Sequence, residues 1–551
     1  MSEQDEASPE KNDEEQGEGR RRTNYLVPDV DPWPLDSDEP IIELEDVYKS
    51  YGDDHVLKGL SLQITPGEIT VIIGASGSGK SVLIKHMNGL LKPDKGTVRL
   101  FGKSTTEISD TELDRVRKRI GTLFQSYALF DSMDVLDNVA FPLVENNAMK
   151  EKEAKEHARE LLEMLGLGDA LEKFPAELSG GMKKRVSLAR ALVTNPEVVL
   201  FDEATTGLDP IMMEFVDSLI EQTTEEFALT SVLISHDMAS TFRLADSIAV
   251  LHDGKIIIHD EPRKVRESDD ERVLQLIRGI RSEEVALETA ASLDLLDGDP
   301  EFAVEVVDVD KKFGELPVLQ GVTMRVPKNK ITVLIGGSGE GKSVMMKHIL
   351  RLLEPDSGVV KVFERDLSEL SEREMRDLRT QIGMLFQHAA LFDSMTVAEN
   401  VAFPLVERQV VSRSEADEKV DDILERLHIA KIRDKYPSEI SSGQRKRVSL
   451  ARALVTEPPL IIYDEPTTGQ DPMMTREVEE MIREVQQNFD VTSLVISHDM
   501  ALTFRLADHV AMLAEGKIVA EGPPRSLLES DDPQVEEFVF ASEVGAHIGG
   551  D

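Results

Sequence analysis

Cysteine is absent from the 551-residue sequence. Disulfide bonds, thiol nucleophiles and cysteine-ligated zinc or iron–sulfur sites are therefore excluded. Long apolar runs are also missing, because no stretch approaches the ~18 consecutive apolar residues that a membrane span needs. The N-terminal sequence MSEQDEASPEKNDEEQGEG has no apolar core and is unlike a secretory signal. These absences predict a cytoplasmic setting.

Basic residues are scarce relative to acidic ones, with 62 Lys and Arg against 105 Asp and Glu and a net charge of -43. Such a surface repels phosphate backbones and disfavours broad nucleic-acid binding. A small anion can still be held by a local nest of backbone N–H groups. Residues 1–40 are rich in Glu, Asp, Pro and Gly, so we expect a disordered acidic tail there.

The main feature of the sequence is an internal repeat with a constant shift. GASGSGKS starts at Gly74, and GGSGEGKS starts at Gly336, 262 residues later. Four further pairs of residues keep this shift: Gln125 and Gln387, Ser179 and Ser441, Asp202 and Asp464, and His236 and His498. The repeat predicts two tandem copies of one domain, 41–283 and 303–551, joined by an acidic linker over 284–302.

Each copy has a mixed α/β pattern. Short β-branched runs such as ITVIIG, EVVLFDE and TSVLISHD, and their counterparts in the second copy, are typical of buried parallel strands. Charged segments with helical spacing, such as Thr111–Arg119 and Lys150–Leu165, lie between them. Strands that alternate with helices predict a sheet covered by helices on both faces.

The two glycine-rich segments fit G-x-x-x-x-G-K-[ST] between a strand and a helix, the pattern of a phosphate-binding loop (P-loop). Glycines let the backbone curl so that its N–H groups surround a phosphate at the start of the next helix. The lysine reaches the terminal phosphates, and the hydroxyl after it ligates magnesium. The residues expected to hold the nucleotide here are Gly74, Ser76, Gly77, Gly79, Lys80 and Ser81, and Gly336, Ser338, Gly339, Gly341, Lys342 and Ser343.

Acidic pairs and histidines end other apolar strands. Asp202 and Asp464 are placed to hold magnesium beside a P-loop. The glutamates that follow them, Glu203 and Glu465, can orient and deprotonate an attacking water. An Asp-Glu pair that merely caps a strand, and a structural histidine, are the alternatives. The repeated order of P-loop, Gln, Ser-Gly, Asp-Glu and His argues against both.

This ordered set resembles the nucleotide-binding domain of ABC ATPases, over nearly all of both copies. ELSGGMKKRVSLARAL matches the signature segment of that superfamily. The resemblance implies that Tyr51 and Phe313 stack on adenine and that Gln125 and Gln387 contact magnesium and the permease. It also implies D-loops at Asp209 and Asp471 and γ-phosphate contacts by His236 and His498.

Such domains pair head to tail and sandwich two ATP molecules, so each P-loop would face the signature of the other copy. The first would face Ser441, Ser442 and Gly443, and the second would face Ser179, Gly180 and Gly181. Ser442 replaces the first signature glycine, and a side chain there could crowd the phosphate. We therefore expect two hydrolytic sites of unequal rate, with the slower site at Lys80.

The segment after each glutamine indicates the branch. Residues 126–145 and 388–407 share 15 of 20 positions and contain ALFDSM and NVAFPL. This form resembles the ATPases of Mla or MCE transporters, which move phospholipids between membranes. The resemblance implies a permease docked at these segments on the cytoplasmic face of the inner membrane, together with MCE-domain partners. Because the two segments are so alike, we predict that the permease has two identical or very similar subunits. A tandem ATPase of a sugar importer and a ribosome-acting tandem ABC protein are the alternatives.

Overall fold

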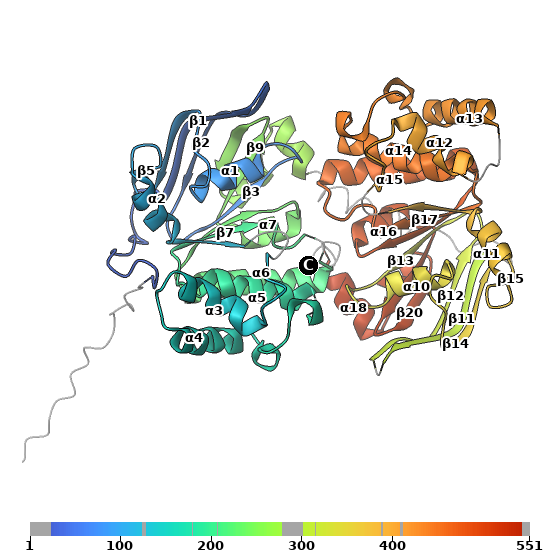
Figure 1. Cartoon of the computed structure of the whole chain (residues 1–551), viewed down its shortest axis with the longest axis horizontal. Helices are drawn as coiled ribbons and strands as arrows, with labels where there is room; N and C mark the ends of the chain where they lie inside the picture. The colour runs from blue at the N-terminus through green and yellow to red at the C-terminus, as the bar shows by residue number, and fades with distance from the viewer. Residues whose placement is uncertain are drawn as a thin grey trace, which may run out of the picture.

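The computed structural model describes residues 24–123, 128–178, 180–206, 208–277, 301–314, 316–386, 389–407 and 412–542. The chain forms two α/β halves of the same design that lie side by side (Figure 1). The predicted fold class and the tandem repeat are confirmed. The expected linker lies outside the described residues up to residue 300, and the second half's first strand begins at Phe302.

Each half contains two sheets. In the first half, an antiparallel sheet has the order β2-β1-β4-β5, and a six-stranded sheet has the order β10-β9-β3-β8-β7-β6. In the six-stranded sheet only β10 runs antiparallel to its neighbour. The strands are β1 (Ile42–Tyr51), β2 (Asp54–Ile64), β3 (Ile69–Ile73), β4 (Lys95–Leu100), β5 (Lys103–Ser104), β6 (Ile120–Leu123), β7 (Val198–Asp202), β8 (Thr230–Ile234), β9 (Ser247–His252) and β10 (Lys255–Asp260).

The second half repeats both sheets, in the orders β12-β11-β14-β15 and β16-β17-β18-β13-β19-β20. Its strands are β11 (Phe302–Phe313), β12 (Leu316–Pro327), β13 (Ile331–Ile335), β14 (Ser357–Val362), β15 (Arg365–Asp366), β16 (Ile382–Leu385), β17 (Leu460–Asp464), β18 (Thr492–Ser497), β19 (His509–Ala514) and β20 (Lys517–Gly522). The parallel pairings of β13, β17 and β18 match those of β3, β7 and β8.

Helices cover the sheets. Those of the first half are α1 (Lys80–Met87), α2 (Asp110–Arg117), α3 (Val135–Glu145), α4 (Glu151–Met164), α5 (Gly180–Leu192), α6 (Pro210–Glu226), α7 (Met238–Leu244) and α8 (Pro262–Arg266). Those of the second half are α10 (Lys342–Ile349), α11 (Glu372–Arg379), α12 (Val397–Glu407), α13 (Arg413–Arg426), α14 (Ser442–Leu454), α15 (Pro472–Phe489), α16 (Met500–Leu506), α17 (Arg525–Leu528) and α18 (Pro533–Phe540).

The central strands explain where chemistry can occur. Every residue of β3 and of β8 is buried, because helices pack on both faces of the sheet and each strand consists mostly of apolar or β-branched residues. Strands β3, β8 and β7 are parallel neighbours, so their carboxyl ends meet at one edge of the sheet. The P-loop, the Asp-Glu pair and the histidine each follow one of these ends, which is the position where open α/β sheets bind ligands.

Residues 24–40 differ from the expected tail, because they pack on the first half as a strap. The Asn24 side chain donates to Lys118 O at 3.0 Å, and the Tyr25 N–H donates to Thr194 O at 3.1 Å. The Trp33 N–H donates to Glu197 Oε2 at 2.6 Å. The apolar residues Tyr25, Leu26 and Trp33 give this short segment enough surface to bury. The prediction of disorder over residues 1–40 is therefore wrong for residues 24–40, and residues 1–23 lie outside the described part.

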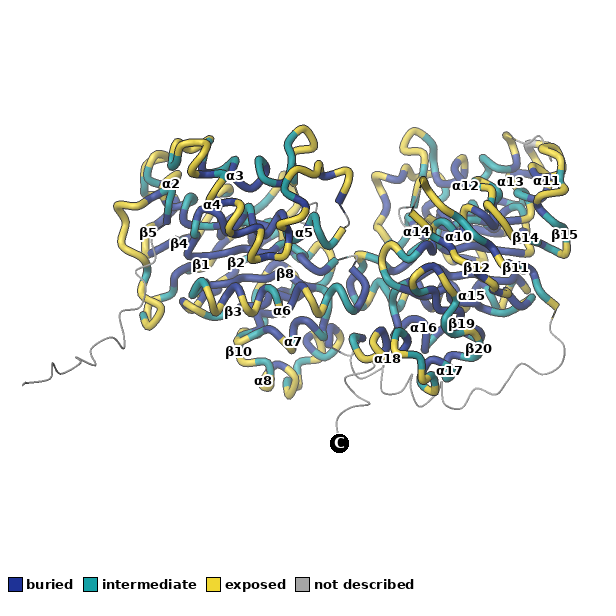
Figure 2. The backbone as a smooth tube through the Cα atoms, turned by 90° about the horizontal axis from the view of Figure 1, so that it is seen from below, coloured by how far each residue is buried: buried dark blue, intermediate teal, exposed yellow. Residues whose placement is uncertain are grey.

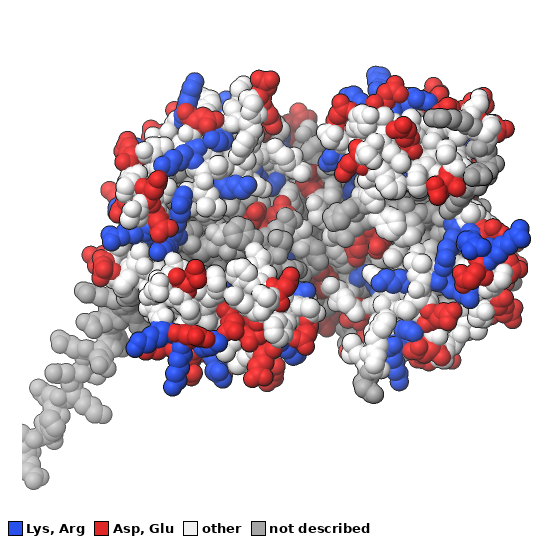
Figure 3. Space-filling view, viewed as in Figure 1, with Lys and Arg blue, Asp and Glu red and all other residues white. Residues whose placement is uncertain are grey.

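In both halves the buried residues lie in and around the sheets, and the exposed residues lie in the outer loops and on the outer faces of the helices (Figure 2). Acidic and basic side chains are interspersed over the face that Figure 3 shows. In the described part of the chain, no helix combines the length and the apolar character needed to cross a bilayer.

Candidate active site

The two P-loops have the backbone shape that their glycines predict. Gly79 and Gly341 directly precede α1 and α10 with φ of +109° and +107°, a left-handed conformation that favours glycine. Ser81 is exposed in the first turn of α1, and Ser343 holds the same place in α10. Each loop therefore presents a helix N-terminus and a free hydroxyl to the same edge of its sheet.

Each P-loop lysine turns back onto its own loop. Lys80 Nζ donates to Gly74 O at 2.7 Å and to Ala75 O at 2.9 Å. Lys342 Nζ does the same toward Gly336 O at 2.7 Å and Gly337 O at 2.8 Å. Burial lowers the pKa of Lys80, and the charges of Glu203 and Asp471 oppose this effect. The two ammonium groups thus lie beside the space where the loops would hold phosphate.

The acidic pair follows β7 in the first half. Asp202 is the last residue of the strand, and Glu203 adopts a φ of +55°, which is uncommon for a residue with a side chain. His236 Nε2 lies 2.8 Å from Glu203 Oε1, and Thr206 donates to Glu203 Oε2 at 3.3 Å. The structure therefore brings the predicted glutamate and histidine of this half into direct contact.

The second half has a similar arrangement, with the other ring nitrogen of the histidine facing the glutamate. Glu465 has a φ of +47°, and its carboxylate lies 2.8 Å from His498 Nδ1 and accepts from Thr468 at 2.8 Å. Lys342 Nζ lies 3.9 Å from Glu465 Oε1, which brings the P-loop lysine and the glutamate close together. Both halves thus carry this carboxylate on a left-handed residue, with a histidine and a threonine as its partners.

The charges of these groups follow from their contacts. Burial by itself raises the pKa of Glu465, but the hydrogen bond and charge of His498 outweigh it and lower the pKa overall. Burial likewise opposes protonation of His498, yet the contact with Glu465 raises its pKa above the usual value. Glu203 also has a lowered pKa, for the same reasons. Both carboxylates are therefore ionised near neutral pH.

Magnesium fits the oxygen donors at each site. In the first half the Ser81 hydroxyl and the Asp202 carboxylate, and in the second Ser343 and Asp464, are the hard ligands that this ion prefers. Burial and the adjacent glutamate raise the pKa of Asp202, which a bound cation would reverse. Among the described residues, no group of three or more His, Asp or Glu side chains is arranged to hold a metal alone. Phosphate oxygens of a bound nucleotide would have to complete the coordination shell of the magnesium ion.

Two reciprocal contacts join the halves at these loops. Ser76 N–H in the first P-loop donates to Asp471 Oδ2 at 2.9 Å. Ser338 N–H in the second P-loop donates to Asp209 Oδ2 at 2.8 Å. Asp209 and Asp471 also cap the N-termini of α6 and α15. The structure therefore places each expected D-loop aspartate against the opposite P-loop, in a head-to-tail arrangement.

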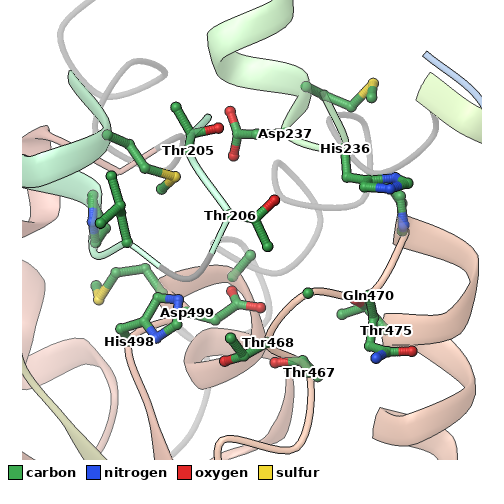
Figure 4. A pocket seen from close by; sticks show the side chains of 18 of the residues that line it. Thr205, Thr206, His236, Asp237, Thr467, Thr468, Gln470, Thr475, His498 and Asp499 are labelled. Carbon is green, nitrogen blue, oxygen red and sulfur yellow. The ribbon is translucent and has the colours of Figure 1, made fainter. Parts of the chain in front are cut away.

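A cavity of about 210 Å³ lies between the halves and is lined by both. Figure 4 shows His236 and Asp237 on one side of it and His498 and Asp499 on the other. Thr206 and Gln470, from the segments that follow the two glutamates, also line it. The P-loop lysines do not line this cavity, whereas the two histidines that contact the glutamates do.

The signature segments begin helices in both halves. Ser441 caps α14, since its hydroxyl accepts from Gln444 N–H at 3.2 Å and its own N–H donates to Gln444 Oε1 at 3.0 Å. Ser442 and Gly443 form the first turn of α14, and Gly180 and Gly181 form that of α5. No contact between a signature and a P-loop is observed in the described residues, so that pairing remains a prediction.

Two buried lysines in the signature helices were missed by the sequence analysis. Lys184 donates to Ala204 O, one residue after Glu203, and Lys446 donates to Pro466 O, one residue after Glu465. Burial lowers the pKa of each to about 8. Each joins a signature helix to the backbone beside one of the two predicted glutamates. The two lysines are 262 residues apart, the shift of the repeat, and this could have identified them from the sequence.

The remaining predicted residues are partly described. Tyr51 ends β1 and is 50% exposed, and Phe313 ends β11 and is 49% exposed, so both rings are free to stack on a base. Gln125, Gln387 and Ser179 lie outside the described residues. Their predicted contacts with magnesium, permease and phosphate therefore stay predictions.

The loops after the two glutamines have equivalent geometry. The buried Asn138 side chain accepts from Phe130 N–H at 2.8 Å and donates to the carbonyls of Phe130, Met133 and Asp134. Asn400 makes the same set of bonds around Phe392. Phe130 and Phe392 are each 42% exposed. Two like surfaces, one in each half, thus present an aromatic ring to solvent.

Comparison with known proteins agrees with this geometry. The family model described as "ABC transporter" matches residues 57–206 and 319–468, more than half of the chain. An ABC transporter ATP-binding protein of Enterococcus faecalis is 30% identical over 557 residues, covering 92% of this chain and 96% of that protein. The oligopeptide transport ATP-binding protein OppD of Mycobacterium bovis is 26% identical over 585 residues, covering 88% of this chain and 95% of that protein.

Among solved structures, CbiO1 from Clostridium perfringens, part of the ABC transporter complex CbiONQ, is 29% identical. The match covers 44% of this chain and 95% of CbiO1, with a TM-score of 0.40.

Proposed function

The chain belongs to the ABC transporter family, and from that premise we propose that it energises phospholipid movement between membranes through a separate permease of the Mla or MCE type. As a member of the family it binds ATP with magnesium and hydrolyses it. The proposal adds the cargo and the partners. It rests on the ALFDSM and NVAFPL segments, which resemble those of the phospholipid branch.

The observation that supports the permease most directly is the equivalence of the two exposed loops. Phe130 and Phe141 lie 4.8 Å apart between ring centroids, and Phe392 and Phe403 lie 4.8 Å apart in the second half. Each pair is held by a buried asparagine with the same four bonds. Two surfaces of the same shape and chemistry suit two identical or closely similar permease subunits.

We propose the following roles in hydrolysis. Glu203 and Glu465, ionised and held by a histidine and a threonine, accept the proton of the attacking water. Lys80 and Lys342 leave their loop carbonyls and stabilise charge on the transferred phosphoryl group. Bound magnesium would neutralise phosphate charge beside Ser81 and Asp202, and beside Ser343 and Asp464. Asp209 and Asp471 keep each P-loop in register with the opposite half.

Import of a small solute is the second candidate. It is supported by OppD of Mycobacterium bovis, a tandem-length relative whose name gives oligopeptide transport. The equivalence of the two loops does not discriminate between cargoes, because it concerns the symmetry of the permease and not its substrate; only the sequences of the loops favour the phospholipid branch. Cargo must therefore be tested on the assembled transporter.

Co-purification is the first test. The full chain would be tagged in its native cells, extracted in mild detergent and its partners identified by mass spectrometry. A permease with an MCE-domain protein supports phospholipid transport. A permease with a soluble solute-binding protein overturns it in favour of import, and ribosomal proteins without a permease overturn both proposals.

A further inference from the structure

The exposed loops are bonded to the signature helices by one arginine in each half. Arg190 lies in the last turn of α5, and its Nη1 donates to Ala128 O at 2.6 Å. Its guanidinium carbon also lies 5.9 Å from the centre of the Phe130 ring. The bond therefore reaches the loop just before the aromatic residue that it exposes.

The second half contains the same link. Arg452 of α14 donates to Ala390 O at 2.8 Å and to Ala389 O at 3.3 Å. Ala128 and Ala390 have φ of +50° and +48°, a left-handed conformation that alanine seldom adopts. A charged donor held on a strained carbonyl in both halves indicates that the loop shape depends on the arginine.

Helix α5 runs without interruption from the signature segment to the arginine that bonds the docking loop. From Gly180 to Arg190, α5 spans about 15 Å at 1.5 Å per residue. One end begins the signature segment, and the other end holds the docking loop. A hydrogen-bonded helix moves as a rigid body, so displacement of its first turn shifts Ala128 as well.

The rest of the loop should move together with Ala128, because hydrogen bonds connect its residues. Phe130 exchanges two bonds with Asn138 of α3, whose side chain is fully buried. Arg190, Ala128, Phe130 and Asn138 thus form one chain of polar contacts from α5 to α3. In the second half Arg452, Ala390, Phe392 and Asn400 form its equivalent.

We propose that Arg190 and Arg452 are positioning residues that transmit movement of the signature helices to the permease-docking loops. The inference rests on the proposed function, since it takes residues 128–145 and 389–407 to be the surfaces that a permease binds. Nucleotide closes the halves, the signature helices shift, and each arginine carries the shift to its loop.

The first test needs no permease. Hydrogen exchange of the full chain would be followed with and without magnesium and a non-hydrolysable ATP analogue. In the wild type, exchange in residues 128–134 and 390–396 should change on binding. Arg190→Met should reduce the change in 128–134 at least fivefold and leave 390–396 as an internal reference, and Arg190→Lys should restore at least half of it.

Arg185→Met is the matched control, because Arg185 lies on the same helix and donates at 3.2 Å to the carbonyls of Leu165 and Gly166 instead of the loop. It should leave the change in 128–134 intact. An unchanged response in Arg190→Met, or an equal loss in Arg185→Met, overturns the link. The reciprocal Arg452→Met should affect 390–396 alone, so the inference remains testable if Arg190→Met folds poorly.

The second test uses the assembled transporter. Arg190→Met should keep ATP hydrolysis by the isolated chain within about twofold while lowering permease-stimulated hydrolysis and transport at least fivefold. Normal stimulation in this variant overturns the inference. If the wild-type chain binds no permease at all, the proposed function fails, whereas the exchange result still decides whether the arginine moves the loop.

Discussion

Single residues predict that the two ATP sites are unequal. The site that contains Lys80 and Glu203 is expected to face Ser441, Ser442 and Gly443, where a serine replaces a glycine. The reciprocal bonds between Ser441 and Gln444 occupy the hydroxyl and N–H that would contact phosphate. Phosphate binding would have to break or rearrange these bonds, and we predict that the Ser442 side chain slows this site relative to the other.

We predict that Glu465→Gln lowers steady-state ATP hydrolysis more than Glu203→Gln does, because it leaves only the slower site. Ser442→Gly should raise the residual activity of Glu465→Gln severalfold. The same substitution should change that of Glu203→Gln little, which provides the control. Phosphate release at saturating ATP measures all four variants. Equal residual activities of the two glutamine variants would refute the inequality.

Two buried lysines predict a pH dependence of stability. Lys184 and Lys446 have a pKa of about 8, whereas lysine in an unfolded chain has about 10.4. Between these values the unfolded state binds more protons, so stability rises with pH, by up to about 1.4 kcal/mol per pH unit for each lysine. The destabilisation is fully present below pH 8 and is relieved above it.

The wild type should therefore gain stability relative to a Lys184→Met, Lys446→Met double variant between pH 7.5 and pH 9.5. Urea unfolding at both pH values measures the difference, and comparison with the variant cancels groups that titrate in both proteins. If the difference in unfolding free energy between the two proteins does not change with pH, these lysines keep an ordinary pKa.

At the scale of elements, the strap of residues 24–40 packs on a buried ion pair that is present in the first half and has no equivalent in the second. Arg119 and Glu197 form a buried ion pair, with side chains 7% and 9% exposed, and Glu197 also accepts from Trp33 N–H. Arg119 lies 3.7 Å from the centre of the Phe101 ring, against which Trp33 packs edge-on. The corresponding residues of the second half are Gln381 and Pro459.

Glu197→Ala should destabilise the first half by about 3 kcal/mol, because it leaves Arg119 buried without its carboxylate. The melting temperature of this half should fall by roughly 6–12 °C. Glu172→Ala, at an exposed position, should change it by less than 2 °C and is the control. Differential scanning calorimetry measures both, and a shift of the same size in both variants would contradict a role for the pair.

At the scale of the whole molecule, the fusion predicts that the ATP sandwich forms within one chain. The bonds from Ser76 to Asp471 and from Ser338 to Asp209 join halves of one chain. Ile211 of α6 packs on the second half's core, and α6 lies beside α18 (Figure 1). Linked sites meet at high effective concentration without a second molecule.

Specific ATPase activity should therefore stay constant from nanomolar to micromolar chain. The specific ATPase activity of an Asp209→Asn, Asp471→Asn double variant should fall at least tenfold, because both contacts between D-loop and P-loop are weakened. Light scattering in the same buffer reports the oligomeric state. Activity that rises with the square of concentration would show that two chains form each sandwich.

Much of the candidate site could be predicted because its chemistry is local in sequence. Each P-loop, each Asp-Glu pair and each histidine follows a buried strand, and short apolar runs were sufficient to place those strands. The same reasoning failed for Lys184 and Lys446, since a lysine in a helix is usually solvated. Only packing against the segment after each glutamate shows that it is buried.

The sequence alone determined the repeat, the α/β class and the order of the catalytic motifs, because each depends on residues close together in the chain. Only the tertiary structure decided which distant groups meet. It placed Asp209 and Asp471 on the opposite P-loops, folded residues 24–40 onto Glu197, and joined Arg190 to Ala128. These contacts form between residues dozens to hundreds of positions apart, and their energy exists only after the sheets and helices have packed.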